Sequence, residues 1–222
     1  MTLNIIPFKR YSGKYNMEED NYLFNSFEQG LLRDTLRIYG WERPCISLGY
    51  TQDPDKELNM ANCNKYGIEV VKRPTGGGIV LHNEHEVTYS FVCDKDDPRL
   101  PEGLVNSYKF LSNIVIEALN KVGVRAKLSD TRHSEQARIC FSFPASYEIT
   151  LDGIKIVGSA QKRGKKALLQ QGSIFIRNTE LKTDELIRNC IDFKSIYDIL
   201  GKEIDQNELT EALSKEFEKV FV

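Results

Sequence analysis

The chain has 222 residues, and its 30 lysines and arginines against 32 aspartates and glutamates give a formal net charge of −2. This balance and a pI near 6.0 argue against general affinity for nucleic acid or for an anionic membrane, because both favour a basic surface. Hydrophobic residues make up 41% of the sequence and charged residues 28%, which excludes a chain that is mainly disordered. The length suits one large domain, or one domain with a small appendage.

Neither a membrane span nor a signal peptide is expected. No apolar run approaches the ~20 residues that cross a bilayer, and residues 1–10 are too short and too polar for a signal peptide, so we expect the cytoplasm. The five cysteines are odd in number, widely spaced and without a Cys-x-x-Cys pair, which favours reduced thiols over disulfides or a zinc site. His82 and His85 are three positions apart, but no carboxylate cluster completes a site around them, so we expect no metal.

The first predicted element is an amphipathic helix over residues 17–32. Leu23, Phe27 and Leu31 recur on one helical face, and Asn16 precedes an acidic first turn as the expected N-cap. Runs rich in β-branched and aromatic residues predict the strands that follow, at 35–39, 46–50, 68–72, 79–81 and 86–92.

The helical pattern is clearest between residues 108 and 122, where apolar residues repeat every three to four positions until Gly123 stops them. Asp152-Gly153 is the dipeptide best suited to a two-residue turn, so strands at 146–151 and 154–159 should form a hairpin. A further strand and three helices are then expected, at 168–176, 183–190, 194–200 and 207–221. Hairpins outnumber strand–helix–strand crossovers, which predicts an α+β fold with a mixed, largely antiparallel sheet flanked by helices.

A two-residue turn also fixes the register of the predicted hairpin. Thr150 then lies opposite Lys155 in the ladder. Because side chains alternate along a strand, Glu148, Lys155 and Val157 share one face and Ile149 lies on the other.

Residues 73–78, Arg-Pro-Thr-Gly-Gly-Gly, lie between two predicted strands. The sequence lacks the Gly-Lys-Ser/Thr ending of a Walker loop and the Gly-x-Gly-x-x-Gly that opens a helix in dinucleotide-binding folds. Three successive glycines let backbone N–H groups approach a carboxylate, phosphate or carbonyl closely, and Arg73 adds a cation. The pattern favours a cradle for an oxyanion or an acyl head group. The alternative is a sharp strand connection with a surface arginine.

Lys155 is a candidate functional lysine, because it interrupts an apolar strand and is followed by Gly158, Ser159 and Ala160. Small residues at these positions leave room for an extended ligand to lie against the sheet. The alternative is an exposed lysine on the outer face of a hairpin.

Cys140 is a candidate nucleophile, since it falls in a region without clear periodicity and is therefore predicted in a loop. A thiol with an ordinary pKa of ~8.5 needs a nearby cation to ionise at neutral pH, and Lys155 could supply it. The alternative is a small buried hydrophobe. His82 and His85 are candidate bases, although capping a strand connection is the favoured interpretation of both.

Four motifs in this order resemble the lipoate/biotin protein ligase superfamily, and the resemblance covers most of the chain. They are residues 16–20, 37–41 with 47–50, 73–78 with His82, and 155–161. The resemblance implies a single catalytic domain of the biotin/lipoate protein ligase type over residues 1–222, with a helical C-terminal segment at 180–222 packed on it.

Within this superfamily, lipoate ligases activate a free acid with ATP, whereas octanoyltransferases take octanoate from acyl carrier protein through a cysteine thioester. Cys140 and Phe141, shortly before Glu148, resemble the cysteine segment of the octanoyltransferase branch. The resemblance implies that Cys140 accepts octanoate from octanoyl-acyl carrier protein and passes it to a lysine of a lipoyl-domain protein, such as glycine cleavage H protein or a 2-oxoacid dehydrogenase E2 domain. No cofactor is then needed.

The resemblance also implies roles for the other candidates. Lys155 would activate the thiol or polarise the acyl carbonyl. The remaining residues would line or adjoin the acyl site, namely Arg73, Thr75, Gly76, Gly77, Gly78, His82, Gly158, Ser159 and Ala160.

Asn83 and Gln171 stand where the superfamily commonly has Asp and His, and Gly78 is more typical of the ligases. Three other functions therefore stay open. An ATP-dependent lipoate ligase without its accessory domain would need ATP and magnesium. An octanoyl amidotransferase between lipoyl domains would use the same cysteine, and a catalytically silent module would bind acyl groups or lipoyl domains.

Overall fold

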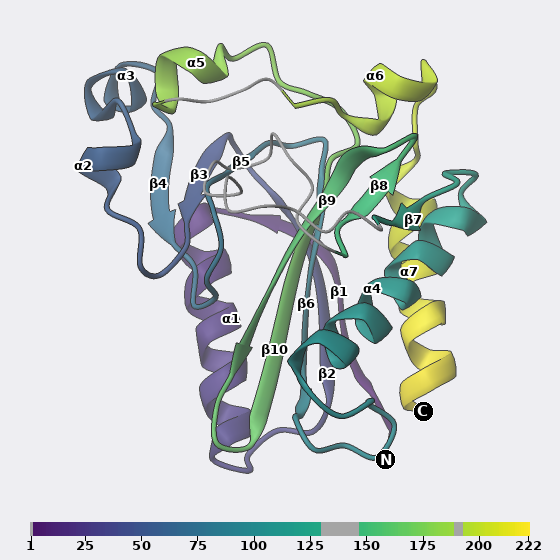
Figure 1. Cartoon of the computed structure of the whole chain (residues 1–222). Helices are drawn as coiled ribbons and strands as arrows, with labels where there is room; N and C mark the ends of the chain where they lie inside the picture. Colours follow the sequence, from purple (N-terminus) through teal and green to yellow (C-terminus); the bar gives the residue numbers. More distant parts are fainter. Residues whose placement is uncertain (1, 130–146, 189–192) are drawn as a thin grey trace.

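The computed structural model describes residues 2–129, 147–188 and 193–222, with helices on both sides of a central sheet (Figure 1). The strands are β1 (Asn4–Tyr11), β2 (Thr35–Trp41), β3 (Cys45–Leu48), β4 (Glu69–Lys72), β5 (Val80–His82), β6 (Val87–Asp94), β7 (Lys127–Leu128), β8 (Ile149–Leu151), β9 (Ile154–Arg163) and β10 (Ala167–Ile174). The helices are α1 (Gly13–Glu28), α2 (Pro54–Glu57), α3 (Met60–Lys65), α4 (Leu104–Lys121), α5 (Thr183–Leu186), α6 (Ile196–Leu200) and α7 (Gln206–Phe221). None of these described helices is long and apolar enough to cross a membrane.

The described strands form a seven-stranded sheet in the order β1-β2-β6-β10-β9-β8-β7 and a three-stranded sheet in the order β4-β3-β5. Neighbours in the larger sheet pair antiparallel except for β1 and β2, which are parallel. In the smaller sheet, β3 pairs parallel with β4 and antiparallel with β5. The predicted mixed, largely antiparallel sheet flanked by helices is confirmed.

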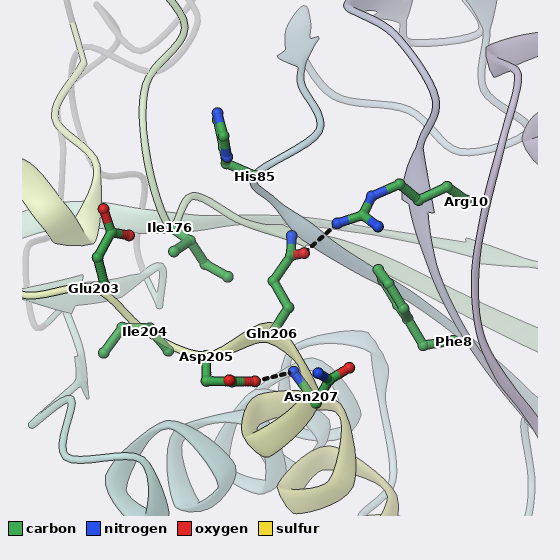
Figure 2. Close-up of a pocket in the computed structure, with 9 residues that line it drawn as sticks. All are labelled: Phe8, Arg10, His85, Ile176, Glu203, Ile204, Asp205, Gln206 and Asn207. Carbon is green, nitrogen blue, oxygen red and sulfur yellow. Dashed lines mark hydrogen bonds between the residues drawn. The ribbon is translucent and has the colours of Figure 1, made fainter.

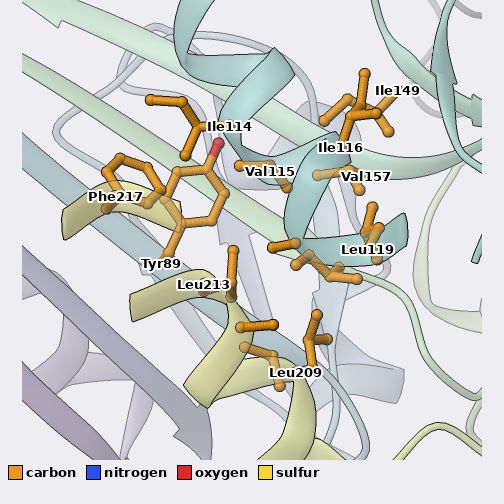
Figure 3. Close-up of a cluster of buried hydrophobic side chains, with 14 of the residues drawn as sticks. Tyr89, Ile114, Val115, Ile116, Leu119, Ile149, Val157, Leu209, Leu213 and Phe217 are labelled. Carbon is orange, nitrogen blue, oxygen red and sulfur yellow. The ribbon is translucent and has the colours of Figure 1, made fainter. Parts of the chain in front are cut away.

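Helices cover both faces of the larger sheet. Successive side chains of its central strands point to opposite faces, so each of these strands packs against helices on both sides. On β10, Leu168 packs in the core beneath α4 and α7, whereas Leu169 packs against α1. Figure 3 shows the first of these cores, where Val115 of α4 and Phe217 of α7 meet Tyr89 of β6. The larger sheet is therefore the middle of three layers, and polar groups buried within it need partners inside the protein.

The first helix differs from the prediction at both ends. α1 begins at Gly13, where Ser12 is the N-cap and its hydroxyl accepts a hydrogen bond from the Tyr15 amide. The predicted cap, Asn16, lies inside the helix and is fully buried. The helix also ends before Leu31, which the prediction placed on its apolar face and which is 71% exposed.

The predicted hairpin forms around Asp152-Gly153, whose φ angles are 51° and 79°. Thr150 lies opposite Lys155, as predicted. A register shift follows, so that Ile149 lies opposite Val157 and both side chains are buried in the core. The prediction that these two residues point to opposite faces is wrong, because a bulge shifts the pairing at this point.

The C-terminal third contains the helices expected there, with one much shorter than predicted. The helix predicted at 183–190 is only the single turn of α5, because Ile187 leaves it to form a β-bridge with Leu58. α6 and α7 agree with the prediction to within two residues, and α7 packs on α4. Four elements, β1, α2, α3 and β7, are additions to the predicted set.

Candidate active site

Arg73 holds the glycine loop, defined here as residues 73–78, in its shape. Its Nη1 donates to the Ser47 carbonyl and hydroxyl oxygens at 2.8 and 2.9 Å, and its Nη2 donates to the carbonyls of Gly76 and Gly78 at 2.9 and 2.7 Å. The side chain is buried, so the alternative of a surface arginine is wrong. A planar guanidinium suits this task because its donors form a fixed fork.

The glycine loop lies against two other segments of the predicted site. Gly77 has a φ of +91°, which favours glycine, and a methyl group placed there would lie 3.8 Å from the Cβ of Ala160 on β9. Gly49 approaches the loop more closely, since a methyl group there would lie 2.2 Å from the Gly77 carbonyl oxygen. The structure thus brings the glycine loop beside the small residues of β9, as the prediction of a common site requires.

Thr75 links the loop to the centre of the larger sheet. Its hydroxyl donates to Gln171 Oε1 at 2.7 Å, and Gln171 Nε2 donates to Asp20 Oδ2 at 2.6 Å. Gln171 lies opposite Ala160 in the β9–β10 ladder, so one side chain borders both predicted binding segments. The side chains of Thr75, Gln171 and Asp20 are all buried.

Asp20 is the centre of a buried polar network. Its carboxylate accepts hydrogen bonds from Arg37 Nη1 at 2.8 Å, Tyr39 at 2.7 Å and Ser90 at 2.8 Å, besides that from Gln171. Burial and the negative charge of Asp20 hold the pKa of Tyr39 well above its usual value, so its hydroxyl remains a donor. Neither the acidic first turn nor the strand pattern of the sequence predicts this network.

His82 lies at the end of β5 and is 2% exposed, as part of a buried hydrogen-bond chain. Its Nε2 is 2.6 Å from the Ser47 hydroxyl and its Nδ1 is 2.6 Å from Glu86 Oε1, while Trp41 stacks on the ring at 3.7 Å. Burial lowers the pKa of His82, although the Glu86 carboxylate opposes the shift. A neutral ring then donates from Nδ1 to Glu86 and accepts at Nε2 from Ser47.

The order Ser47, His82, Glu86 is that of a hydrolase triad, but its position argues against nucleophilic chemistry. Ser47 is fully buried, and its oxygen also accepts a hydrogen bond from Arg73. The hydrogen-bond chain therefore runs from Glu86 through His82 and Ser47 to Arg73, whose guanidinium shapes the glycine loop. We interpret His82 as a residue that holds the Ser47 hydroxyl, and through it Arg73, in position, and not as a base.

Lys155 lies near the start of β9 in a buried ion pair. Its Nζ is 2.6 Å from Glu148 Oε2, and the side chains of Lys155 and Glu148 are 13% and 11% exposed. Burial raises the pKa of Glu148, and the positive charge of Lys155 opposes this shift. The alternative of an exposed lysine on the outer face of the hairpin is therefore wrong.

The small residues that follow Lys155 line up with β10 and approach α4. Gly158 lies opposite Ser173 in the ladder, and the Ser159 carbonyl accepts a hydrogen bond from the Tyr108 hydroxyl at 3.5 Å. Tyr108 is a residue that the sequence prediction assigned only to a helix. Its hydroxyl shows that α4 reaches the same part of β9 as the predicted site.

Cys140 lies outside the residues that the structure describes, so its place relative to Lys155 stays a prediction. Of the other cysteines, Cys45, Cys63 and Cys93 are free and buried. Burial raises the pKa of all three thiols, which makes them poor nucleophiles at neutral pH. Within the described ranges, no group of three or more metal-ligating side chains comes together.

A separate cavity of about 340 Å³ lies between β1, the turn after β5 and the start of α7 (Figure 2). Its lining residues are Phe8, Arg10, His85, Ile176, Glu203, Ile204, Asp205, Gln206 and Asn207. Arg10 donates to Gln206, and Asp205 caps α7 by accepting from the Asn207 amide. His85 is thus placed at this cavity and away from the glycine loop.

Comparisons with known proteins identify the family of the chain. Residues 12–218 match the lipoyl protein ligase A/B catalytic domain. The chain belongs to this family. The match spans all four motifs that resemble the lipoate/biotin protein ligase superfamily, and it confirms that resemblance.

Curated relatives are similar to the chain in sequence, and solved structures are similar to it in fold. The chain is 31% identical to Octanoyltransferase LipM of Clostridioides difficile, over 98% of this chain and 88% of that protein. It is 38% identical to Octanoyltransferase LipM of Carboxydothermus hydrogenoformans, over 88% of this chain and 71% of that protein. A crystal structure of lipoate-protein ligase A bound with ATP superposes with a TM-score of 0.83 at 19% identity, covering 99% of this chain and 85% of that one. The bipartite lipoate protein ligase of Thermoplasma acidophilum, studied with its E2 lipoyl domain, gives a TM-score of 0.74 at 18% identity, with 99% and 82% covered.

Proposed function

We propose that the protein is an octanoyltransferase of lipoate biosynthesis, which moves octanoate from octanoyl-acyl carrier protein to a lysine of a lipoyl-domain protein. The relatives named Octanoyltransferase LipM carry this proposal, because they are 31% and 38% identical over most of the chain. The buried Lys155 and the close-packed glycine loop fit acyl-group chemistry, since a site of this kind needs fixed donors around a carbonyl.

The proposed reaction consists of two acyl transfers. In the first, the Cys140 thiolate attacks the thioester carbonyl, a new carbon–sulfur bond forms, and the thiolate of the carrier leaves. In the second, the neutral amine of the acceptor lysine attacks the acyl-enzyme, the bond to Cys140 breaks and its thiolate is regenerated, and the proton that the amine loses balances the one that the carrier thiolate takes up to become a thiol. Two easier steps replace one difficult step.

Residues near the glycine loop would serve these steps by position and charge. Lys155 would stabilise the thiolate or the carbonyl oxygen, and Gly77, Ser159 and Ala160 would border the acyl group. Each CH₂ of the octanoyl chain that enters an apolar cavity would contribute ~0.8 kcal/mol to binding. The mechanism needs no cofactor.

The acceptor would be a lipoyl-domain protein, such as glycine cleavage H protein or a 2-oxoacid dehydrogenase E2 domain. The archaeal ligase of similar fold was analysed as part of a lipoylation system that includes its E2 lipoyl domain, which supports this class of partner. Octanoyl-acyl carrier protein is proposed as the donor from the octanoyltransferase relatives.

An ATP-dependent lipoate ligase is the second candidate, because a lipoate-protein ligase bound with ATP has the same fold at a TM-score of 0.83. In that case the acid would be activated as an adenylate, and Cys140 would be dispensable. Because the identity to that ligase is 19%, the similarity shows a common fold, and an experiment must decide the reaction.

The deciding experiment incubates wild type, Cys140→Ala and Cys63→Ala with octanoyl-acyl carrier protein in the absence of ATP. Cys63 is a buried thiol in α3 and serves as the matched control. We expect an octanoyl mass increase that hydroxylamine removes, in wild type and in Cys63→Ala but not in Cys140→Ala.

Adding ATP with the free acid, or an octanoylated lipoyl domain as the donor, to the same three proteins distinguishes the alternatives. Adenylate formation from ATP that survives Cys140→Ala would identify a ligase. Loading of wild type from an octanoylated lipoyl domain, but not from acyl carrier protein, would identify an amidotransferase. Binding of octanoyl species without either activity would identify a silent module.

A further inference from the structure

The two halves of the candidate site belong to different sheets. The glycine loop follows β4 of the smaller sheet, whereas the small residues that border it, among them Ala160, lie on β9 of the larger sheet (Figure 1). Any movement of one sheet against the other would therefore change the distance between the loop and β9. A contact that spans the two sheets is needed to fix this distance.

The hydrogen bonds of the loop backbone tie the loop to the smaller sheet. Arg73 joins the loop carbonyls of Gly76 and Gly78 to the Ser47 carbonyl of β3. The amide of Tyr50, two residues after β3, donates to the Thr75 carbonyl at 3.1 Å. These hydrogen bonds fix the shape of the loop and its place beside β3.

The hydroxyl of Thr75 supplies a link to the larger sheet. It donates to Gln171 Oε1 on β10 at 2.7 Å, and Gln171 lies directly opposite Ala160 in the β9–β10 ladder. Thr75 and Gln171 are 0% and 5% exposed, so water does not compete for either group. Loss of this hydrogen bond would leave a buried polar atom unsatisfied and would release the loop from β10.

Asp20 fixes the direction of the link. Its carboxylate accepts hydrogen bonds from three other side chains, namely Arg37, Tyr39 and Ser90. The Gln171 amide therefore turns its nitrogen to Asp20, where Nε2 donates to Oδ2 at 2.6 Å, and its oxygen to Thr75. The single hydroxyl hydrogen of Thr75 is used in this contact, so Thr75 has none to donate to a substrate carbonyl.

We propose that Gln171 is a positioning residue, which sets the distance between the glycine loop and β9 through its hydrogen bond with Thr75. The inference rests on the proposed acyl transfer at this site. Thr75 serves as the anchor of the loop and not as a donor to the acyl carbonyl. Because a misplacement of about 1 Å costs a large factor in rate, loss of this link should slow the transfer.

The kinetic test measures octanoyl transfer from octanoyl-acyl carrier protein to a lipoyl domain in Thr75→Val, Gln171→Leu and the double variant. We expect each single change to lower kcat by about tenfold or more, and the double variant to be no slower, because all three remove the same link. Thr75→Ser keeps the hydroxyl and should restore the wild-type rate. Losses that multiply in the double variant would show that Thr75 acts on the substrate independently, and would overturn the proposal.

Ser90→Ala is the matched control. Ser90 lies opposite Gln171 in the β6–β10 ladder and donates to the same carboxylate at 2.8 Å, but its hydroxyl makes no described hydrogen bond to the glycine loop. This change also removes one buried hydrogen bond, so it should lower the urea midpoint as the Thr75 and Gln171 changes do, while the transfer rate stays close to that of wild type. A rate loss equal to that of Gln171→Leu would show a general effect of the buried network, and would overturn the proposal.

Hydrogen exchange gives a test that needs no substrate. The Tyr50 amide reports the position of Thr75, because it donates to the Thr75 carbonyl. Its exchange should be about tenfold faster in Thr75→Val and Gln171→Leu than in wild type, and unchanged in Ser90→Ala. Unchanged exchange in the folded Thr75 and Gln171 variants overturns the proposal.

Wild type alone gives a further test, which does not depend on the folding of a variant. The Thr75 hydroxyl proton is buried and donated to Gln171, so proton NMR should show that it exchanges with water far more slowly than the hydroxyl of the exposed Thr51. Equally fast exchange of the two hydroxyls would refute the anchor.

These exchange measurements separate the inference from the proposed function. Faster Tyr50 exchange in the variants of a protein that transfers no octanoate would support the anchoring of the loop by Gln171 and refute the octanoyltransferase. Octanoyl transfer with unchanged Tyr50 exchange would do the reverse.

Discussion

Replacing Gly49 with alanine should disturb the glycine loop from outside. The added methyl group would lie 2.2 Å from the Gly77 carbonyl oxygen, well inside van der Waals contact. Arg73 binds the carbonyls on either side, at Gly76 and Gly78, so the loop cannot retreat without weakening these hydrogen bonds. Overpacking costs about 1–3 kcal/mol and a weakened hydrogen bond about 1 kcal/mol, so we expect Gly49→Ala to lower the free energy of unfolding by about 2–4 kcal/mol.

Gly76→Ala is the matched control, because it adds the same methyl group within the loop. The nearest atom there would be in the Tyr50 ring at 3.7 Å, an ordinary contact, so the free energy of unfolding should stay within about 1 kcal/mol of wild type. Urea unfolding followed by circular dichroism measures the midpoint and slope for both variants. Equal losses in the two variants, or a neutral Gly49→Ala, would refute the view that close backbone approach fixes the loop.

Two further predictions concern buried charge. Asp20→Asn leaves the Arg37 guanidinium without its charged partner and should lower the free energy of unfolding by about 3–5 kcal/mol, whereas the exposed Glu211→Gln should change it by less than about 1 kcal/mol in the same urea titration. Because burial holds the pKa of His82 below its usual value, the unfolded chain binds this proton first as the pH falls. Stability should therefore decline below about pH 6.5, by up to about 1.4 kcal/mol at pH 5.5, and His82→Gln should remove that part of the decline between pH 7.5 and 5.5.

The predicted elements are those whose patterns are local. The turn at Asp152-Gly153 and the helix α4 follow from short-range signals, and both form. β1 was missed because Pro7 interrupts its apolar run. The strand lies at the edge of the sheet, where proline is tolerated, and its register with β2 is irregular between Ile6 and Lys9. Its parallel partner follows only after α1, so no hairpin signal marks the pairing.

The start of α1 was misplaced for a related reason. Asn16 and Asp20 look like a cap and an acidic first turn, but they lie inside the helix and bind Arg37 of β2. A polar residue that faces a partner in the core has the same local pattern as one that caps a helix. Only the tertiary contact distinguishes the two cases.

The candidate site residues were easier to predict than the residues that hold them. The glycine loop points to Thr75, yet its hydrogen-bond partner Gln171 lies 96 positions later in the sequence. Asp20, which Gln171 also binds, lies 151 positions before Gln171. The hairpin register did place Glu148 on the same face as Lys155. Their burial could not be predicted in this way, because burial depends on tertiary packing around the hairpin and not on its register.

The buried cations of the described structure have different tasks. Arg37 and Arg73 each meet several oxygens that belong to fixed elements, and a planar, permanently charged guanidinium suits such multiple contacts. Lys155 carries its charge on a flexible chain, in contact with the carboxylate of Glu148. In the proposed acyl transfer, this side chain would lie beside the carbonyl oxygen on which negative charge develops. The arginines therefore preserve the shape of the glycine loop and of α1, whereas the proposed acyl transfer would use the lysine at the substrate.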